Sequence, residues 1–571
     1  MTAASPVVLG LCALTHDSAA ALIAGGRLVG FCEEERLSGE KHTSAYPTRA
    51  VSWLLSKAGL TPDQVDVVGY NFQPGRYFPA LAGVPGQLMR SATRRRTLPR
   101  AASFVKVAGR TRTRLRHIGH RYPTARVAPV LHHRTHGLYA FAASGHEDAA
   151  VLVVDSLGET QTTTIGHARR TGTRVNYRIL AAIDDPASLG YLYGAVTEHL
   201  GWRRGDEEGT VMALAALGDS ARFRDLFTRA VRIIDTGFTL DPNLLPLRVL
   251  SRRYPRLSPA FVAAACPPRP AEAPVEPVHA DLAAALQERT EQVMLHLAAR
   301  ARRLTGSGLL CLAGGVAANC VAIGKIAQAG LFDEVHVPPA SGDSGTAIGA
   351  ALACHQQLTG RLAEGVTGEC YLGPAWDSLP SELRTAAGVK THRVDEPVRF
   401  LAEQLANGAI VGLFRGRLEA GPRALGNRSI LASPLLPDVV QRLNATVKYR
   451  EPFRPFAPVV LAAHAKDYFT LDQPAPFMSI ASPVTDLTRT RIPAVVHVNG
   501  TARVQTVTPA QNPFLATVLA EFAALTGVPV LINTSLNVKG KPIAGTPTMA
   551  LDTLTGSGLD ALLIGDWWVT T

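Results

Sequence analysis

The sequence predicts an α/β protein with a duplicated core, followed by a second α/β domain. Two segments with the same order of apolar runs and polar turns, VVLGLCALTHDSAAALIAGGRLVGF and AAVLVVDSLGETQTTTIGHARR, begin about 140 residues apart, as expected of an internal repeat. Two further segments, GLLCLAGGVAANCVAIGKI and EVHVPPASGDSGTAIGAAL, follow the order strand, loop and helix. Because strands alternate with helices, we expect sheets that are covered by helices.

The first repeated segment is predicted to open with a β-hairpin. Its two apolar runs are joined by Gly25-Gly26, a dipeptide that favours a tight turn. A helix is expected at about 48–59, and the apolar run VDVVGYNF behind it indicates a strand. The segment therefore supplies strands before and after one helix.

The second repeated segment predicts three strands, and an irregular region follows it. Residues at about 240–280 are rich in proline and are expected to be an insertion without regular structure. A long helix is predicted from about Ala280 to Leu304, ahead of the two strand–loop–helix segments.

The chain is longer than one ordinary domain, since it has 571 residues. Residues 356–395 carry many Gly, Pro and polar side chains, as a linker does. A new α/β pattern begins at about 396. We therefore predict a first domain at 1–357, a linker at 358–395 and a second domain at 396–571.

Composition argues for a globular protein outside the membrane. The chain is 46% hydrophobic and 18% charged, and no stretch has 18 uninterrupted apolar residues, so no membrane span is expected. The N-terminal residues lack the basic start of a signal peptide. The seven cysteines form no CxxC pair and lie mostly in apolar runs, which is typical of reduced, buried thiols. We expect a cytoplasmic location.

The net charge of +12 has two interpretations. A basic chain can bind nucleic acid, and it can also bind small phosphorylated substrates. Much of the excess lies in the arginine-rich stretch 90–116. Its apolar residues recur at helical intervals, so we interpret this stretch as the solvated face of ordinary helices and expect no nucleic acid as partner.

Two histidines and two aspartates are candidate metal ligands. His132 and His136 are four residues apart and share a face if their segment is helical. Asp155 and Asp343 each follow an apolar strand, where clefts commonly open. Two imidazoles and two carboxylates would suit iron, manganese or zinc. Taken singly, the histidines also fit an ordinary helix face, and each aspartate also fits a helix cap or a turn.

Two glycine loops and one histidine are further candidates in the first domain. Ala313-Gly314-Gly315-Val316 and Gly342-Asp343-Ser344-Gly345 each lie between an apolar run and a helix, where bare main-chain amides favour an anion. Plain turn chemistry explains such loops equally well. His16 follows the first strand and is a natural proton acceptor, or else a turn histidine beside its neighbour Asp17.

The C-terminal part concentrates cationic and amide side chains in apolar surroundings. Arg and Lys recognise phosphate groups, and unpaired buried charge is costly, which argues against scattered salt bridges. Asn533, Ser535 and Asn537 alternate, so they share one face if the chain is extended. The cationic candidates of this part are Arg423, Arg428, Lys448, Arg450, Arg454 and Arg503.

These strings together resemble the NodU/CmcH family of O-carbamoyltransferases. The matching strings occur in family order and cover nearly the whole chain. They are HDSAAAL, EEER followed by Lys41-His42, HHRTH, VVDSLGE, SLGYLYGAVTEHLG, AGGVAANC, GDSGTAIGAAL, GPRALGNRSILASP, VKYREPFRPFAP, GTARVQTV and NTSLN.

The resemblance implies an actin-like ATPase fold (ASKHA, duplicated RNase H-like) at the N-terminus and a YrdC-like α/β domain at the C-terminus. The YrdC-like domain would make carbamoyl-adenylate from carbamoyl phosphate and ATP, with Mg²⁺. The N-terminal domain would transfer the carbamoyl group to a hydroxyl near an Fe(II) ion. The acceptor class that the family implies is a hydroxylated natural product, such as an antibiotic or a macrolide.

The resemblance also implies roles for individual residues. His16 would be the base that deprotonates the acceptor hydroxyl, and Lys41 would lie near the transfer site. The metal ligands would be His132, His136, Asp155 and Asp343. Carbamoyl phosphate and the nucleotide would be held by Arg423, Lys448, Arg454, Arg503, Ser535 and Asn537.

The chain departs from the family pattern at several positions. Thr210 stands in EGTVMALA where the family has a lysine, so a positive charge expected near the N-terminal nucleotide site is missing. Arg203 or Arg204 could replace it. Arg415 stands in place of a family glutamine, and Ala420 stands where phenylalanine is common.

Two other functions fit parts of the pattern. A tRNA-modifying carbamoyl- or threonylcarbamoyl-type transferase would use the basic stretch 90–116, and its binding would fall steeply with salt. A non-catalytic, nucleotide-sensing actin-like protein would not need the C-terminal cations. The segments at about 73–125 and 240–280 are the candidate acceptor-binding loops, and their mix of apolar residues and arginine favours a large, partly apolar acceptor over a polycation.

Overall fold

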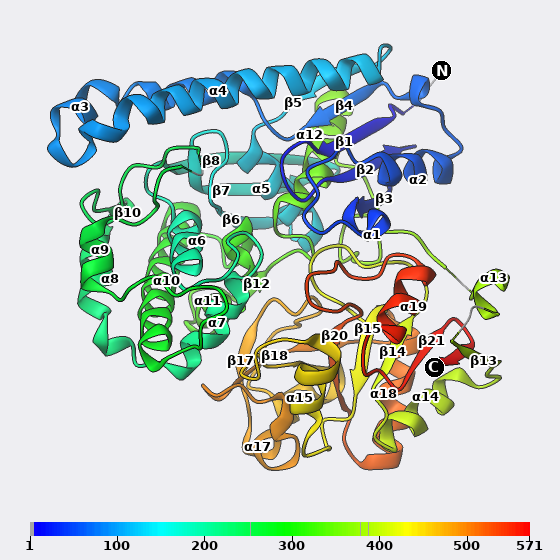
Figure 1. Cartoon of the computed structure of the whole chain (residues 1–571). Coiled ribbons are helices and arrows are strands. Elements are labelled where there is room, and N and C mark those ends of the chain that lie inside the picture. The colour runs from blue at the N-terminus through cyan, green and yellow to red at the C-terminus, as the bar shows by residue number, and fades with distance from the viewer. Residues whose placement is uncertain (1–4, 252, 377, 386–387) are drawn as a thin grey trace. The chain divides into compact units, whose positions relative to one another are not determined.

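The computed structural model describes residues 5–251, 253–376, 378–385 and 388–571, which form two compact units (Figure 1). The first unit contains 55–368 and two short N-terminal segments, 1–14 and 21–29. The second unit contains 369–571 and also takes 15–20 and 30–54 from the N-terminal part of the chain. Two segments near the N-terminus are therefore grouped with the C-terminal part of the chain.

The first five-stranded sheet has the strand order β3-β2-β1-β4-β5. Strands β1 (Val8–Cys12), β4 (Val67–Tyr70) and β5 (Arg126–Pro129) run parallel. The neighbours β2 (Ala19–Ala24) and β3 (Arg27–Glu33) are joined through Gly25 and Gly26, whose φ angles of 59° and 77° glycine adopts without steric cost. The predicted hairpin is confirmed.

The second five-stranded sheet repeats this arrangement. Its order is β12-β11-β6-β7-β8, with β6 antiparallel to β7 and β7 to β8, and with β6, β11 and β12 parallel. In each sheet the first strand in chain order has the next strand of the chain on one side and a parallel strand on the other. For β1 these neighbours are β2 and β4, and for β6 they are β7 and β11. The structure thus confirms the duplicated core and the actin-like fold class. The strands of this sheet are β6 (Asp148–Val154), β7 (Gln161–Thr171), β8 (Arg174–Asp184), β11 (Leu309–Ala313) and β12 (Glu334–His336).

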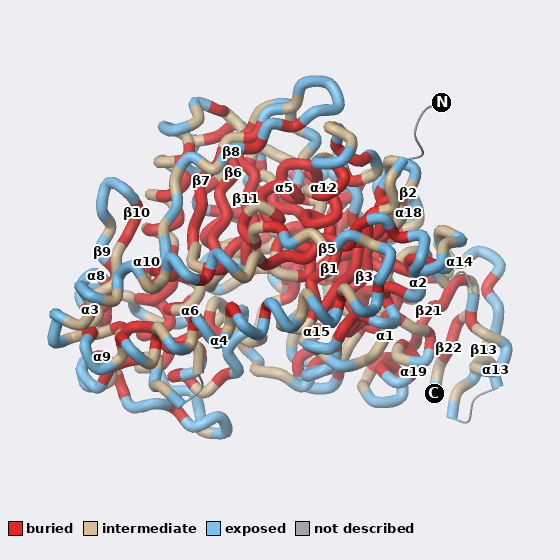
Figure 2. Tube along the Cα trace, turned by 90° about the horizontal axis from the view of Figure 1, so that it is seen from above, coloured by how far each residue is buried: buried red, intermediate tan, exposed pale blue. Residues whose placement is uncertain are grey.

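Three long helices pack on these sheets or extend from them. Helix α12 (Thr346–Thr359) contacts β1, β4 and α5 (His132–Ser144), and α10 (Pro277–Thr305) contacts β6. The predicted long helix at 280–304 is therefore confirmed. Helix α4 (Ser91–Arg121) buries only a helical stripe and is exposed or intermediate elsewhere (Figure 2), as predicted for the basic stretch.

The second unit contains an eight-stranded mixed sheet of order β13-β22-β21-β14-β15-β20-β16-β19. Helices α14 (Pro397–Ala406) and α18 (Pro513–Thr526) bury their apolar faces in its core. This confirms the predicted second α/β domain. The strands are β13 (Lys390–Arg393), β14 (Val411–Phe414), β15 (Arg428–Ala432), β16 (Ala457–Leu461), β19 (Gln505–Val507), β20 (Val530–Ser535), β21 (Ala561–Ile564) and β22 (Trp567–Thr570).

The structure differs from the predicted linker at both ends of 358–395. Helix α12 extends to Thr359, and β13 pairs antiparallel with β22. The short strand KTHR escaped prediction because all four of its residues are charged or polar and its burial pattern is mostly exposed, as is common at a sheet edge. Residues 390–393 therefore belong to the C-terminal sheet.

The remaining elements are short. The Pro-rich region at 240–280 is largely irregular, as predicted, apart from α9 and the start of α10 at Pro277. Two small antiparallel ribbons pair β9 (Val231–Ile234) with β10 (Gly237–Leu240) and β17 (Ala481–Pro483) with β18 (Thr501–Arg503). The other α-helices are α1 (Glu35–Ser38), α2 (Thr48–Ala58), α3 (Val84–Met89), α6 (Leu189–His199), α7 (Glu208–Leu214), α8 (Arg224–Ala230), α9 (Pro259–Ala264), α11 (Cys320–Gln328), α13 (Ser381–Arg384), α15 (Val439–Arg442), α16 (Ala465–Tyr468), α17 (Asp486–Arg491) and α19 (Pro547–Thr555).

All seven cysteines are buried and none forms a disulfide, as the sequence predicts. Within the described ranges, every helix is too short or too polar to cross a membrane.

Helix α12 approaches α5 so closely that Gly349 cannot be replaced without movement. A Cβ at Gly349 would lie 1.9 Å from the carbonyl oxygen of Thr135 on α5. Gly349→Ala is therefore expected to lower the free energy of unfolding by about 1–3 kcal/mol, the usual cost of overpacking. Chemical denaturation would measure this loss.

Gly109→Ala on α4 is the matched control, because a Cβ there meets nothing within 4 Å. Alanine favours a helix interior, so this variant should gain roughly 0.5–1 kcal/mol. Equal stability of Gly349→Ala and the wild type would contradict the close packing of α12 on α5.

Candidate functional site

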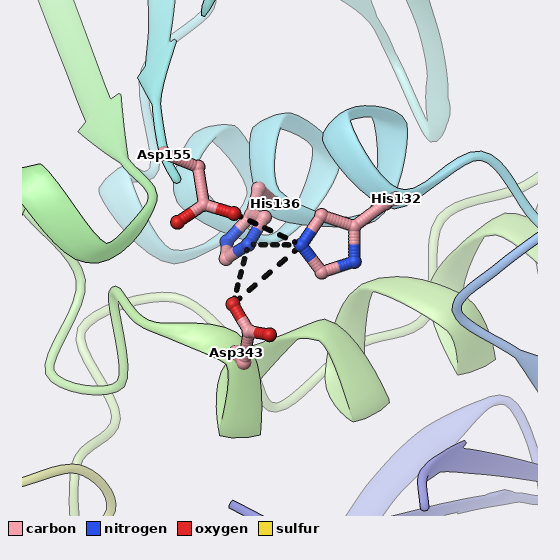
Figure 3. Close-up of side chains that lie close together, drawn as sticks. All are labelled: His132, His136, Asp155 and Asp343. Carbon is pink, nitrogen blue, oxygen red and sulfur yellow. Dashed lines mark hydrogen bonds and ion pairs between the residues drawn. The ribbon is translucent and has the colours of Figure 1, made fainter. Parts of the chain in front are cut away.

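Three elements of the first unit bring four predicted ligands together (Figure 3). His132 and His136 lie one turn apart on α5, so both imidazoles leave the same face of the helix. Asp155 is the first residue after β6, and Asp343 opens the short 3-10 turn that leads into α12. The ends of a strand and of a loop thus meet one helix face.

The four side chains are close enough to share one ion. The Nε2 atoms of His132 and His136 are 3.2 Å apart. His132 Nε2 lies 3.3 Å from Asp155 Oδ2, and Asp343 Oδ1 lies 3.5 Å from the Nε2 atom of each histidine. The two histidines are almost fully buried, and at most a tenth of each aspartate side chain is exposed. The cluster is therefore shielded from bulk water.

Neighbouring groups fix the orientation of His132. Its Nδ1 lies 3.3 Å from the carbonyl oxygen of Asn71, so Nδ1 carries the proton and Nε2 presents its lone pair to the cluster. Phe72 stacks on the ring with centroids 4.4 Å apart. His133 turns away and contacts Thr164 Oγ1 at 3.2 Å, as expected for a residue off the ligand face.

The electrostatics of the cluster favour a positive charge at its centre. Burial by itself lowers the pKa of His132, but the charges of Asp343 and Asp155 outweigh burial and hold this pKa well above its usual value. Burial and Asp343 raise the pKa of Asp155, and the hydrogen bond and charge of His132 outweigh them and lower it. The carboxylates of Asp155 and Asp343 can therefore both be ionised only when a positive charge, such as that of His132, lies between them.

The residues present fit a divalent transition metal. One ligand atom from each of the four side chains lies within 4.8 Å of the others. Two imidazole nitrogens and two carboxylate oxygens suit iron, manganese or zinc, and the carbonyl partner of His132 is the outer-shell contact that such ligands usually have. The cluster is therefore a candidate metal centre.

The loop between β1 and β2, which belongs to the second unit, holds an aspartate between two histidines. His16 Nδ1 lies 2.9 Å from Asp17 Oδ2, and His42 Nδ1 lies 2.5 Å from Asp17 Oδ1. Burial raises the pKa of Asp17, but the hydrogen bonds and charges of His16 and His42 outweigh burial and hold it well below its usual range. Asp17 thereby orients His16 with Nε2 as the proton-accepting atom.

The backbone of this loop is held in unusual conformations. Asp17 and His42 have φ angles of 55° and 54°, in the left-handed region that side chains other than glycine seldom adopt. Such conformations cost energy and gather at functional sites. Lys41, the other predicted residue here, precedes His42 and is half-buried.

Two residues of the EEER string hold a loop of the C-terminal domain. The N–H of Gly421 donates to Glu33 Oε1 at 2.8 Å, and Arg36 Nη2 donates to the Gly421 carbonyl at 2.7 Å. Glu33 and Arg36 are themselves buried and lie 3.8 Å apart. All three residues belong to the second unit, which explains why this N-terminal segment groups with it.

The other two residues of the string, Glu34 and Glu35, bind main-chain groups of α2 and of His42. Glu34 accepts the main-chain N–H groups of Arg49 and Ala50 in the first turn of α2. Glu35 accepts the N–H of His42 at 2.8 Å. Each residue of the string therefore binds main chain, and none is left as a solvated charge.

The loop that carries Arg423 is fixed by one buried carboxylate. Glu419 Oε1 accepts the main-chain N–H groups of Leu425, Asn427 and Arg428 at 2.8–2.9 Å. Arg423 is half-buried on this loop. The structure thus places Arg423 on a rigid turn, although nothing in the sequence pattern had singled out Glu419.

Arg428, one of the cationic candidates from the sequence, has a structural position instead. Its guanidinium is fully buried and lies 3.7 Å from the ring centroid of Phe414. It donates to the carbonyl oxygens of Arg415, Gly416 and Asn427, and burial lowers its pKa to about 10.

Lys448 is buried, and among the described residues its hydrogen-bond partners are neutral oxygens. Its Nζ donates to the carbonyl oxygens of Ser535 and Asn537 at 2.5 and 3.0 Å, and to Asn537 Oδ1 at 2.8 Å. Ser535 Oγ donates to the same Asn537 oxygen at 2.6 Å. Three predicted residues therefore meet at the end of β20.

The predicted shared face of Asn533, Ser535 and Asn537 is only partly right. Strand β20 ends at Ser535, so Asn537 lies beyond the extended segment. Asn533 is fully buried and donates to Gln505 Oε1 at 2.7 Å. The strand face thus holds the first two residues, and the turn after it returns Asn537 to Lys448.

Arginines surround Lys448 with further positive charge. Burial, Arg450 and Arg454 hold the pKa of Lys448 well below its usual value. Burial, Arg454 and Arg503 do the same for Arg450, against a smaller effect of Glu451. Like charges gathered in a buried place destabilise the fold unless an anion binds among them. This cationic cluster is therefore a candidate phosphate-binding site.

Thr210 carries no charge, and the two arginines that could supply the missing positive charge differ in exposure. Thr210 is fully buried in α7. The Arg203 side chain is 67% exposed and lies 3.8 Å from Asp206. Arg204 is more enclosed and lies 3.9 Å from Glu198. Of the two, Arg204 is the less exposed, with 37% of its side chain accessible.

Sequence reasoning missed several residues that the structure brings into these sites. Asp17 and His42 stand beside the predicted His16 and Lys41, and this adjacency was the available signal for both. Glu419 had no such signal, because its partners are main-chain groups in a loop.

Comparison with known families defines the class of protein. A model described as the carbamoyltransferase N-terminus matches residues 7–352, and one described as the carbamoyltransferase C-terminus matches 402–571. The protein is thus an enzyme of carbamoyl transfer.

Curated relatives agree over most of the chain. Nodulation protein NolNO of Sinorhizobium fredii is 34% identical over 97% of this chain and 79% of that protein. Nodulation protein NolO of Bradyrhizobium diazoefficiens is 36% identical over 77% of this chain and 78% of its own. An uncharacterised protein of Synechocystis is 34% identical over 98% of this chain and 95% of its own. The chain belongs to the NodU/CmcH carbamoyltransferase family, as the sequence predicts.

Among solved structures, HypF of T. kodakarensis is similar over 63% of this chain and 49% of that chain, with a TM-score of 0.30 and 17% identity. This likeness is too weak to add to the strand topology.

Because Asp17 pairs with His16 and His42, we expect the free energy of unfolding to depend on pH. The native pKa of Asp17 lies below that of an unfolded aspartate, about 3.9, so it stabilises the fold above that pH and the contribution is lost as pH falls. Asp17→Asn keeps a residue that tolerates positive φ and should be less stable than the wild type at pH 7. The difference should narrow below about pH 4, as measured by denaturation across pH.

Asp472→Asn is the control, because its side chain is 96% exposed. A stability gap for Asp17→Asn that stays constant down to pH 3 would show that the carboxylate is not held by the two histidines.

Proposed function

We infer that the protein is an ATP-dependent O-carbamoyltransferase that makes carbamoyl-adenylate and passes its carbamoyl group to a hydroxylated natural product. The observation that carries this inference is the buried cationic cluster around Lys448. It suits the phosphates of ATP and carbamoyl phosphate, and it lies in the carbamoyltransferase C-terminal region. Family membership supports carbamoyl transfer in general, and the adenylate route is our proposal.

The proposed chemistry balances in three steps. Water takes the phosphoryl group of carbamoyl phosphate, leaving carbamate and phosphate. A carbamate oxygen attacks the α-phosphorus of ATP, bound with Mg²⁺, and pyrophosphate leaves. The acceptor hydroxyl then attacks the carbamoyl carbon, and AMP leaves with the former carbamate oxygen. One phosphate, one pyrophosphate and one AMP are released for each carbamate ester formed.

In the C-terminal domain, Lys448, Arg454 and Arg503 would neutralise phosphate charge. Lys448 is held in place by Ser535 and Asn537, so it needs little reorganisation when an anion arrives. Arg423 would add a guanidinium fork from the loop that Glu419 holds rigid. Preorganised cations of this kind stabilise the charge that develops as pyrophosphate leaves.

In the transfer step, His16 would accept the proton of the acceptor hydroxyl. Asp17 orients the His16 ring and stabilises the imidazolium that forms, which is the role of the carboxylate in a catalytic triad. Lys41, five residues after the EEER string that shapes this loop, would lie near the reacting group. The base therefore has its orienting partner already in place.

The candidate metal centre would be held by His132, His136, Asp155 and Asp343, with Fe(II) as the proposed ion. When bound, a metal there would supply positive charge to the adenylate phosphate or to the carbamoyl oxygen. The chain itself contributes the dry surroundings and the orientation of His132 through Asn71.

The adenylating step can be tested without knowing the acceptor. With ATP, Mg²⁺ and carbamoyl phosphate alone, the wild type should release pyrophosphate. Lys448→Met should reduce this release by a factor of about 100 or more, because a preorganised charge is lost. A coupled pyrophosphate assay measures both.

Lys466→Met is the matched control, since that side chain is 73% exposed. His16→Ala should keep pyrophosphate release and lose transfer. If folded wild-type protein binds ATP but releases no pyrophosphate, the adenylate route fails and nucleotide sensing becomes the better account.

If the four side chains form a metal centre, the wild type should contain a bound ion and a variant that lacks one ligand should bind it less tightly. The purified wild type should hold close to one equivalent of iron or a competing divalent metal by elemental analysis. Asp343→Asn should weaken metal affinity by about 10-fold or more, because it removes an anionic oxygen that faces both histidines. Pyrophosphate release should persist in this variant.

Asp235→Asn, in the exposed turn between β9 and β10, is the control and should keep its metal. Equal metal content in Asp343→Asn and the wild type would argue against the cluster as the site of binding.

A further inference from the structure

Helix α4 carries positive charges that no acidic residue of the helix balances. The helix has 31 residues, so it is about 46 Å long, and it runs along the outside of the first unit (Figure 1). The whole stretch 67–146 contains neither aspartate nor glutamate. The exposed cations of α4 that form no ion pair with any described residue are Arg94, Arg95, Lys106, Arg110, Arg112 and Arg116.

The spacing of these cations makes them repel one another. Lys106 and Arg110 are four residues apart, and so are Arg112 and Arg116, which places like charges side by side on the helix surface. The buried side of α4, with Phe104 in it, holds the helix in place against this repulsion. An acidic partner on the exposed side would relieve it.

A row of apolar residues runs along the same exposed face. The row consists of Leu98, Ala102, Val105 and Gly109. Their intervals of four, three and four residues place them on one face of a helix. Leu98 is 62% exposed and Val105 is 47% exposed, and a Cβ at Gly109 would meet nothing within 4 Å. The described part of the chain therefore leaves this apolar row uncovered.

Cations flank the apolar row on both sides. With 3.6 residues per turn, Arg94 and Arg112 fall on one side of the row, and Arg95 and Lys106 fall on the other. An apolar seam between charged positions is the pattern by which one helix pairs with another, and the sign of the flanking charges selects the partner. The pattern on α4 therefore selects a helix whose flanking residues are acidic.

Other occupants fit this face less well. A second copy of α4 would bring arginine against arginine. Nucleic acid phosphates would contact the cations but would leave Leu98 and Val105 against a hydrated backbone. A bilayer surface is entered by large apolar side chains, whereas half of this row is Ala102 and Gly109, which allow a helix to approach closely.

We propose that the exposed face of α4 docks an acidic amphipathic helix of a partner protein, with the apolar row at the centre of the contact. The partner helix would carry apolar residues at matching intervals and Glu or Asp on both sides of them. Because the flanking charges are exposed, its affinity would fall as salt is added. The proposal does not depend on the chemistry of carbamoyl transfer.

The probe is a synthetic acidic peptide of about four heptads, with leucine in one row and glutamate on both sides of it. The control peptide has the same composition in scrambled order, so its charge is equal and its apolar row is absent. Fluorescence anisotropy at physiological salt should show the wild type binding the amphipathic peptide at least about 10-fold more tightly than the scrambled one. The double variant Leu98→Gln with Val105→Gln should lose this preference.

A second pair of substitutions tests the charges. Arg95→Gln with Lys106→Gln should weaken binding of both peptides by about 3- to 10-fold and reduce the dependence on salt, because two flanking charges are removed. Arg303→Gln and Leu304→Gln, at the exposed end of α10, are the matched controls and should bind as the wild type does. All variants should keep the wild-type melting temperature, since the changes are on the surface.

Three results would overturn the proposal. Equal binding of the two peptides by the wild type would leave this face as solvated charge alone. Tighter binding of duplex RNA, or of vesicles of phosphatidylglycerol and phosphatidylcholine, than of the amphipathic peptide would assign the face to nucleic acid or to a membrane. A clear drop in melting temperature in the Leu98 and Val105 double variant would show that the apolar row packs within the fold.

Discussion

Asp155 and Asp343 lie inside the first unit within reach of the same two imidazoles, and buried charges of one sign at this separation need a cation among them. Much of the first unit serves this arrangement. The close packing of α12 on α5 sets Asp343 beside the histidines, and the carbonyl of Asn71 fixes which nitrogen faces the centre. Burial disfavours an isolated carboxylate, whereas two carboxylates and two imidazoles gathered at one place would favour a metal ion among them.

The second unit shows the same constraint with the opposite sign. Lys448 and Arg450 are buried among neutral oxygens and other cations, against the smaller effect of Glu451, and an anion would balance this charge. Buried charges without opposite partners lower the stability of a fold. Such a loss is typical of binding sites whose ligand supplies the missing opposite charge.

Rigid main-chain contacts support each of these charged groups. Glu419 binds three amides of the loop that carries Arg423, and Glu33 binds the amide of Gly421 on the same loop. Asp17 holds both His16 and His42. A charged group held by fixed partners needs little reorganisation when its ligand binds, which is the main way in which folded proteins stabilise developing charge.

The sequence by itself determined the α/β class, the repeat, the turn at Gly25-Gly26 and the four metal-ligand candidates, because strand and helix periods and chemically distinctive residues are local properties. Only the tertiary structure decided that 390–393 is an edge strand and that Glu419 fastens a loop. The strand pairs with residues 174 to 180 positions further along the chain, and the partners of Glu419 are main-chain amides, which carry no sequence signal.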